Sequence, residues 1–324
     1  MPGSYLSVNY QLRPAKGVER RMFAETLRRL TPFANLESYR YVGFGSPFFA
    51  DFSLFHRALG IATMINIEVE ESDRPRFRFN RPFGCVQLRF GRSTAVLDRL
   101  RGWRTPTILW LDYDGRLDRG SLEDVRIFFT NAGSGSVILV TVNAEPLRGK
   151  DERETDANRL AEAAKLEGRA VPALSIRPED LGGSGTARYF RKHIDSRIQQ
   201  TLNARNSGLD ETDPSRMEYR QLFYFEYADS TRMLSVGGIL YRRGDRARLR
   251  ECKLTRKAVP FIRTADEPCD IQVPPLTAHE VRHLNAQLPL KQKRVLAAPG
   301  VSDTALARFR EIYRYYPAYF VAET

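Results

Sequence analysis

The sequence predicts an α/β protein built on a mainly parallel β-sheet that ends in an antiparallel hairpin. Short apolar runs alternate with helical patterns between residues 40 and 142, as expected when helices connect parallel strands. The run at 107–111 is almost continuously apolar, which is typical of a strand covered on both faces. Two later runs, 222–227 and 233–241, have only a short polar connection between them, so we expect them to pair as a hairpin.

A helix is predicted at the N-terminal side, because Pro14 is favoured in a first helical turn and apolar residues follow at helical spacing. Its apolar residues are Val18, Met22, Leu27 and Leu30. The charged residues Glu19 and Arg20 lie mostly on the other side, so we expect them to face solvent. Arg13 and Lys16 stand at the start of the helix, where they either face solvent or contact a ligand.

Residues 39–47 form the turn around which the rest is arranged. Gly43 and Gly45 give a turn without Cβ atoms, and Ser46, followed by proline, has the residue types of a helix N-cap and first turn. Such a turn lets a ligand lie against backbone at the carboxyl edge of a parallel sheet. The third glycine of the dinucleotide fingerprint is replaced by phenylalanine, which counts against NAD or FAD. An ordinary tight turn remains the alternative.

The next two predicted strands supply further candidates for binding a nucleoside. The second strand, 61–69, contains Glu68, and a carboxylate roughly 20 residues beyond such glycines is where a ribose diol is bound. The third strand, 85–90, is followed by Ser93 at the opening of another helix. In a nucleoside-binding sheet a polar residue there would meet the base, so Ser93 is also a candidate.

The fourth predicted strand ends in two carboxylates, Asp112 and Asp114. The carboxyl end of a central strand lies in the crevice where such folds bind ligands, although a helix cap or a turn would use the same residues. Close neighbours of like charge raise one another's pKa, so one aspartate could act as a base nearer neutral pH. If the N-terminal segment folds over this edge, Arg13 and Lys16 supply the compensating charge.

Several of these segments together resemble a prokaryotic family labelled "putative O-methyltransferase", from about residue 8 to 143. The segments are Leu12-Arg13-Pro14-Ala15-Lys16 with Glu19-Arg20, Tyr41-Val42-Gly43-Phe44-Gly45-Ser46, Asp51-Phe52 with Leu54-Phe55-His56-Arg57, and Trp110-Leu111-Asp112-Tyr113-Asp114. The resemblance implies the Rossmann-like fold of class I S-adenosylmethionine-dependent methyltransferases, in which a parallel core is completed by an antiparallel hairpin. It also implies S-adenosyl-L-methionine as the cofactor.

The resemblance and the strand-end positions together give the expected site. We expect the cofactor to be bound by Gly43, Gly45, Ser46, Glu68, Ser93 and Asp112. We expect the catalytic residues to be Asp112, Asp114, Arg13 and Lys16. The sequence after the fourth strand lacks the paired prolines of enzymes that methylate amino groups of adenine or cytosine. A hydroxyl acceptor, on RNA or on a small molecule, is therefore the expected substrate.

Composition and length suggest how the chain is organised. We expect an N-terminal helical segment at 1–39, a methyltransferase-like core at 40–257 and a C-terminal helical extension at 258–324 of this 324-residue chain. No apolar run approaches membrane-spanning length, so we expect no membrane partner. Three widely spaced cysteines in no metal-ligand pattern predict a reduced, cytoplasmic protein. The sequence favours no particular oligomeric state.

The most basic stretch, residues 241–263, has nine basic and two acidic side chains, and the chain as a whole has a net charge of +12. Alternation at 246–250 predicts arginines on one face of a strand, which suits a phosphate backbone. A charged edge strand that resists aggregation is the alternative. The expected nucleic-acid-binding residues are Arg242, Arg243, Arg246, Arg248, Arg250 and Lys253. A second hypothesis for function is thus a nucleic-acid-binding protein that keeps the fold without turnover.

Near the C-terminus, His279, Glu280 and His283 match the H-E-x-x-H motif of zinc peptidases. Thr277 and Glu280 also form a capping-box pattern, which places the motif in the first turn of a helix. No later histidine exists to complete a ligand set. We therefore expect no metal site.

Overall fold

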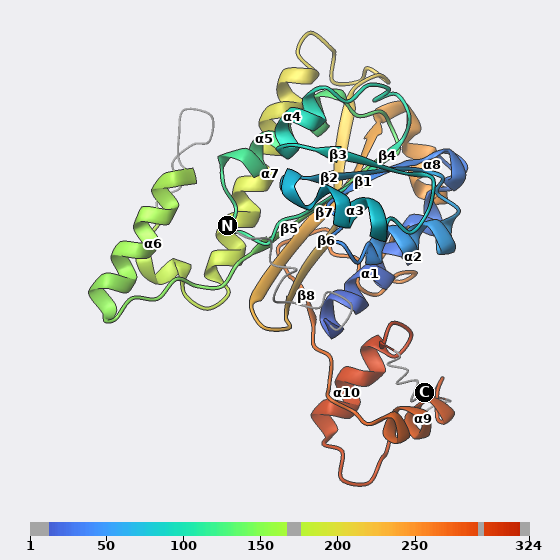
Figure 1. Ribbon diagram of the computed structural model, residues 1–324, viewed down its shortest axis with the longest axis vertical. Coiled ribbons are helices and arrows are strands. Elements are labelled where there is room, and N and C mark those ends of the chain that lie inside the picture. The colour runs from blue at the N-terminus through green and yellow to red at the C-terminus, as the bar shows by residue number, and fades with distance from the viewer. Residues whose placement is uncertain (1–12, 167–175, 291–294, 318–324) are drawn as a thin grey trace.

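A mixed eight-stranded sheet forms the centre of the protein, with strand order β3-β2-β1-β4-β5-β7-β6-β8 (Figure 1). The computed structural model describes residues 13–166, 176–290 and 295–317. The strands are β1 (Arg40–Gly43), β2 (Thr63–Glu68), β3 (Val86–Phe90), β4 (Thr107–Asp112), β5 (Ser136–Asn143), β6 (Met217–Ala228), β7 (Arg232–Arg242) and β8 (Cys269–Ile271). β1 to β5 are parallel, and β7 is antiparallel to both β5 and β6. This confirms the predicted parallel core with its hairpin.

Helices cover both faces of the sheet, and each strand sends alternate side chains to the two faces. The helices of the core are α1 (Pro14–Leu27), α2 (Ala50–Leu59), α3 (Arg74–Asn80), α4 (Ser93–Asp98), α5 (Arg119–Asn131), α6 (Glu152–Leu166), α7 (Gly185–Arg205) and α8 (Arg246–Glu251). Tyr41 and Trp110 join the apolar cluster beneath α1 and α2, whereas Val42 and Leu111 join the cluster beneath α5 and α7. The sheet is therefore the middle of three layers.

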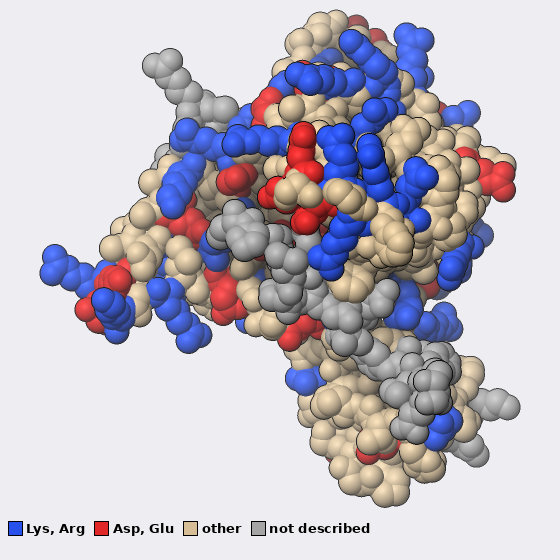
Figure 2. Space-filling model, viewed as in Figure 1, with Lys and Arg blue, Asp and Glu red and all other residues tan. Residues whose placement is uncertain are grey.

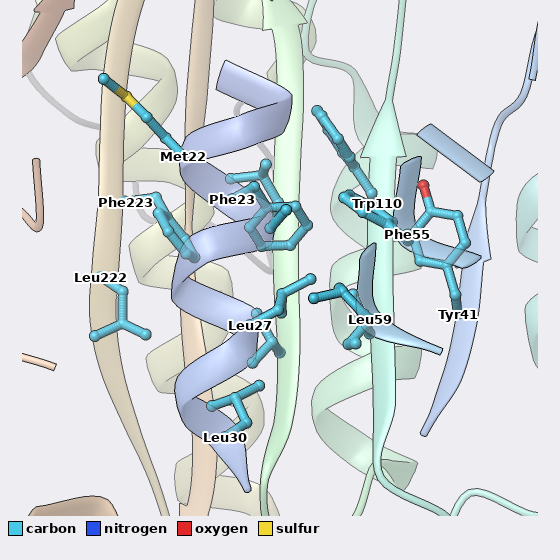
Figure 3. Close-up of a cluster of buried hydrophobic side chains, with 14 of the residues drawn as sticks. Met22, Phe23, Leu27, Leu30, Tyr41, Phe55, Leu59, Trp110, Leu222 and Phe223 are labelled. Atoms are coloured by element: carbon cyan, nitrogen blue, oxygen red, sulfur yellow. The ribbon is translucent and has the colours of Figure 1, made fainter. Parts of the chain in front are cut away.

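The helix α1 packs its apolar side directly on the sheet (Figure 3). Phe23 lies at its centre and makes edge-to-face contacts with Trp110 of β4, at 5.2 Å between ring centroids, and with Phe223 of β6, at 5.1 Å. Burial of apolar side chains such as Phe23 contributes about 1.5–3 kcal/mol each. The N-terminal segment is thus part of the main core.

The expectation that Glu19 and Arg20 face solvent is wrong, because their side chains are only 0% and 8% exposed. The first turn of α1 lies over the carboxyl edge of β4 and over β6, where polar groups meet. The Lys16 ammonium lies there at 2.8 Å from Glu19 Oε2, and the Tyr227 hydroxyl of β6 donates to the same oxygen at 3.1 Å. A buried carboxylate requires such partners.

The turn between β6 and β7 fixes the start of α1. The Asp229 carboxylate accepts hydrogen bonds from the backbone N–H groups of Ala15, at 2.9 Å, and Lys16, at 3.1 Å. The first N–H groups of a helix have no partner within the helix, and negative charge is favourable at this end. The hairpin therefore determines where the first turn of α1 lies.

The predicted helix start at Ser46 is also wrong. α2 begins at Ala50, and its N-cap residue Phe49 has a left-handed backbone with φ of 44°. The Ser46 carbonyl accepts the N–H of Phe49 at 2.9 Å, so residues 46–49 form a tight turn before the helix. A proline in this stretch is accommodated as a turn residue instead of the first residue of the helix.

The strand predicted at 246–250 does not form, because these residues belong to the helix α8. Glu218 of β6 binds Arg246 through two contacts, at 2.8 and 2.6 Å, and Asp245 pairs with Arg248 at 3.3 Å. These i,i+3 and cross-element pairs favour the helical turn. Part of the positive charge of the segment is thereby paired within the protein.

The described residues after β8 form a small lobe that lies below the sheet in Figure 1. β8 pairs in parallel with β6, so the predicted extension contributes an edge strand to the main sheet. The helices α9 (Ala278–Ala286) and α10 (Asp303–Ile312) pack around their own apolar cluster. The expected capping box of Thr277 and Glu280 is confirmed at the start of α9. In the described part of the chain, no helix is both long and apolar enough to cross a bilayer.

We predict that Lys16→Met destabilises the protein by about 3–5 kcal/mol, because it leaves buried carboxylates without their cation. Urea unfolding measures the loss. The double variant Lys16→Met, Glu19→Gln should recover part of it, since it removes one of the unpaired charges. Equal stability of Lys16→Met and the natural protein would contradict a structural role for the ammonium.

Candidate functional site

A cavity of about 640 Å³ opens at the carboxyl ends of four neighbouring parallel strands. Its walls come from the segments that follow β1, β2, β3 and β4. This is the crevice in which open α/β sheets bind ligands, and the volume lies within the ordinary range of small-molecule sites.

The structure brings five of the predicted site residues into the lining of this cavity. They are Ser46, Glu68, Ser93, Asp112 and Asp114. The other four predicted residues, Gly43, Gly45, Arg13 and Lys16, do not line it. Arg13 is the N-cap residue of α1, and its proposed part in catalysis stays a prediction.

The two glycines serve close packing, which we did not predict. A Cβ atom on Gly45 would lie 2.7 Å from the Phe52 ring and 2.9 Å from Asn66 Oδ1. The Gly45 N–H donates to the same Asn66 oxygen, at 2.5 Å. A Cβ atom on Gly43 would lie 2.5 Å from the Tyr41 hydroxyl. The turn after β1 can therefore approach β2 and the Tyr41 side chain only because it lacks side chains here.

Glu68 ends β2 and faces one end of the cavity. Its Oε1 accepts the N–H of Glu70 at 3.0 Å. Burial raises the pKa of Glu68, and the negative charges of Glu70 and Asp114 raise it further, against the opposing effect of backbone hydrogen bonds. Glu68 and Asp114 therefore line the same cavity, and the Asp114 charge is one of those that act on Glu68.

Asp112 ends β4 and is held by the buried Lys16. The Lys16 Nζ atom lies 2.7 Å from Asp112 Oδ1 and 4.4 Å from the centre of the Trp110 ring. Only 2% of the Lys16 side chain is exposed. Lys16 therefore acts on the cavity through Asp112, by fixing the direction of that carboxylate.

A second polar group at the Asp112 end was missed by the sequence interpretation. Asp51 of α2 and Arg20 of α1 both line the cavity, and the Tyr41 hydroxyl donates to Asp51 Oδ2. Burial raises the pKa of Asp51, and the Asp112 charge adds to this, while Arg20 and Tyr41 oppose it. Asp51 could have been recognised from the sequence, because it is an acidic residue near the start of a helix whose apolar face is aromatic. The sequence analysis cited Asp51 only as part of the family resemblance.

Aromatic and hydroxyl groups form the remaining wall. Phe44, after β1, and Tyr113, after β4, meet edge to face at 5.2 Å between ring centroids. The Tyr113 hydroxyl donates to the buried Asp124 at 2.6 Å. Burial raises the pKa of Asp124, and a hydrogen bond from Ser93 opposes this rise. Ser93 is thus tied to the protein as well as facing the cavity.

Two residues of the zinc-peptidase motif, Glu280 and His283, have structural partners. Thr277 and Glu280 bond each other's backbone, and His283 Nε2 lies 3.1 Å from the carbonyl of Ala297. Across residues 13–166, 176–290 and 295–317, no three His, Cys, Asp or Glu side chains gather as metal ligands would.

Several solved structures share part of this architecture. Cofactor-bound Rv0187 from MTB is 13% identical with a TM-score of 0.39, and the match covers 74% of this chain and 82% of that one. Trm1 from Pyrococcus horikoshii with S-adenosyl-L-methionine is 12% identical with a TM-score of 0.43, covering 70% and 57%. The O-methyltransferase TomG from Streptomyces achromogenes, in complex with SAM, is 15% identical with a TM-score of 0.35, covering 73% and 93%.

Comparison with protein families gives a match over a larger part of the chain. None of the curated proteins matches this sequence significantly. The model of a methyltransferase family described as "Putative O-methyltransferase" matches residues 8–324, which is nearly the whole chain. The sheet order, the antiparallel hairpin and the cavity at the carboxyl edge all agree with that description. This protein belongs to the putative O-methyltransferase family.

Proposed function

We propose that this protein transfers a methyl group from S-adenosyl-L-methionine to a hydroxyl group of its acceptor. The observation that carries the proposal is a cavity at the carboxyl ends of the parallel strands that is lined by four carboxylates, Asp51, Glu68, Asp112 and Asp114. Family membership supports the reaction class. The cytoplasmic location expected from the sequence remains part of this proposal.

The half of the cavity that contains Glu68 has the features of a nucleoside site. A carboxylate at the end of the second strand accepts hydrogen bonds from ribose hydroxyls in comparable sheets. Ser93 and Arg92 follow the neighbouring strand and would face the base. Asp112, at the end of β4, would accept a hydrogen bond from the amino group of the methionine part. These residues fit the cofactor in chemistry and in order along the sheet.

The other end of the cavity provides for the acceptor. When bound, S-adenosyl-L-methionine would supply an activated methyl group, carried on a positively charged sulfur, for transfer to the acceptor oxygen. The acceptor hydroxyl must lose its proton in this step, and a carboxylate with a raised pKa can accept it. We assign this role to Asp51, with Arg20 and Tyr41 as its positioning residues. Lys16 is a positioning residue for Asp112.

We predict that S-adenosyl-L-methionine and its demethylated product, S-adenosyl-L-homocysteine, both raise the melting temperature. A ligand at a hundredfold excess over its Kd stabilises by roughly 2.7 kcal/mol. Glu68→Ala should weaken this effect, whereas Glu71→Ala, an exposed residue outside the lining, should not. If neither ligand gives a shift at millimolar concentration, the alternative of a fold retained without turnover is favoured instead.

We also predict that the rate of methyl transfer rises with pH as Asp51 loses its proton. Because burial raises the pKa of Asp51, this rise should lie above the ordinary aspartate range near 4. Asp51→Asn should remove the rise and lower the rate by about 10²–10⁴-fold, with cofactor affinity nearly unchanged. The acceptor for this assay is found by screening cell fractions with radiolabelled cofactor.

Asp114→Asn is the matched variant for this experiment, because the sequence analysis named Asp114, with Asp112, as a candidate for the base. If Asp114→Asn rather than Asp51→Asn abolishes the pH-dependent rise, the base is Asp114. Carbon-13 NMR of the labelled carboxyl groups gives a second readout that requires no acceptor. A resonance lost in Asp51→Asn should titrate above the ordinary aspartate range.

A further inference from the structure

A basic surface lies at the sheet edge formed by β3 and α3. Between residues 74 and 97 the chain has no acidic residue and six arginines. They are Arg74, Arg76, Arg78, Arg81, Arg89 and Arg92. All except Arg74 are exposed. Figure 2 shows basic side chains gathered where α3 lies in Figure 1, beside a small acidic group.

Much of this charge is not paired within the protein. Arg74 contacts Glu71 at 3.4 Å, and Arg89 makes a hydrogen bond to the neutral Gln87. Arg78, Arg81 and Arg92 form no ion pair with any residue of the described ranges. In contrast, on the basic segment singled out from the sequence, Arg246 and Arg248 each have a carboxylate partner. The α3 edge therefore keeps positive charge available to an outside partner.

An exposed aromatic ring stands among these arginines. Phe77 points into the core, where it meets Phe49 and Phe90. Phe79, two residues further along α3, projects outward with 89% of its surface exposed. An exposed ring flanked by arginines is the combination on which nucleic-acid bases stack while phosphates are bound.

The surface continues to the mouth of the cavity. The Arg74 guanidinium lies 4.6 Å from the centre of the Phe90 ring, which ties the start of α3 to the end of β3. The next residues after β3, Gly91 and Arg92, line the cavity, as does the exposed Val69 just before α3. A nucleic-acid strand bound along α3 would thus reach the cavity.

We propose that the α3–β3 edge binds single-stranded nucleic acid, with phosphates on Arg78, Arg81 and Arg89 and a base stacked on Phe79. Binding at this surface does not require methyl transfer. The inference therefore stands or falls separately from the proposed reaction.

Fluorescence anisotropy with labelled 12-nucleotide RNA and DNA, of mixed sequence, tests it over a range of salt. The triple variant Arg78→Gln, Arg81→Gln, Arg89→Gln should reduce the slope of log K against log salt by up to about 2, since each single-strand phosphate contact contributes about 0.7. Phe79→Ala should weaken binding about 5- to 150-fold and leave the slope unchanged. The RNA and DNA probes show which sugar is preferred.

The matched control is Arg242→Gln, Arg248→Gln, Arg250→Gln, which removes the same charge from the segment around α8. We expect it to keep the salt slope of the natural protein. Absence of binding to both probes at low salt would overturn the inference. A salt slope that falls only in the control variant would also overturn it. A third contrary result would be that duplex DNA and polyglutamate, a polyanion without bases, bind as well as the single strands and that Phe79→Ala has no effect. Circular dichroism of each variant verifies that it is folded.

Discussion

The buried Lys16 ammonium is the contact on which the arrangement of this protein depends. A positive charge inside a protein is costly unless oppositely charged and hydrogen-bonding groups surround it. Here those groups come from α1 itself, from β4 and from β6, through Glu19, Asp112 and Tyr227. Since these elements are far apart in the sequence, one side chain holds the N-terminal helix, the central strand and the hairpin in a single relative position.

This contact also brings positive charge to the wall of the cavity. α1 lies over the carboxyl edge of β4, and its residue Arg20 lines the cavity together with Asp51 and Asp112. Lys16 pairs with Asp112, and the Arg20 charge lowers the pKa of Asp51 against the effect of burial. Glu68 lines the same cavity from the end of β2. The N-terminal helix thus supplies the cations that lie next to Asp112 and Asp51.

The number of basic residues in a stretch does not by itself show how much of its positive charge is left unpaired in the folded protein. Residues 241–263 are the most basic stretch, yet Glu218 and Asp245 neutralise part of that charge once β6 and α8 are assembled. Residues 74–97 are less conspicuous in the sequence. Three of their arginines, Arg78, Arg81 and Arg92, nevertheless form no ion pair within the described residues.

The sequence alone determined the parallel core, the hairpin, most helices and the strand ends at Glu68 and Asp112, because hydrophobic periodicity and glycine turns are local properties. Only the tertiary structure decided which charged residues are buried. Glu19, Arg20 and Asp51 look like solvent-facing or motif residues until α1 and α2 are placed over the sheet. The stretch 246–250, expected as a strand, is a helix in which Arg246 pairs with Glu218 from the distant strand β6. Local patterns specify elements, whereas the partners of a buried charge come from residues distant in the chain.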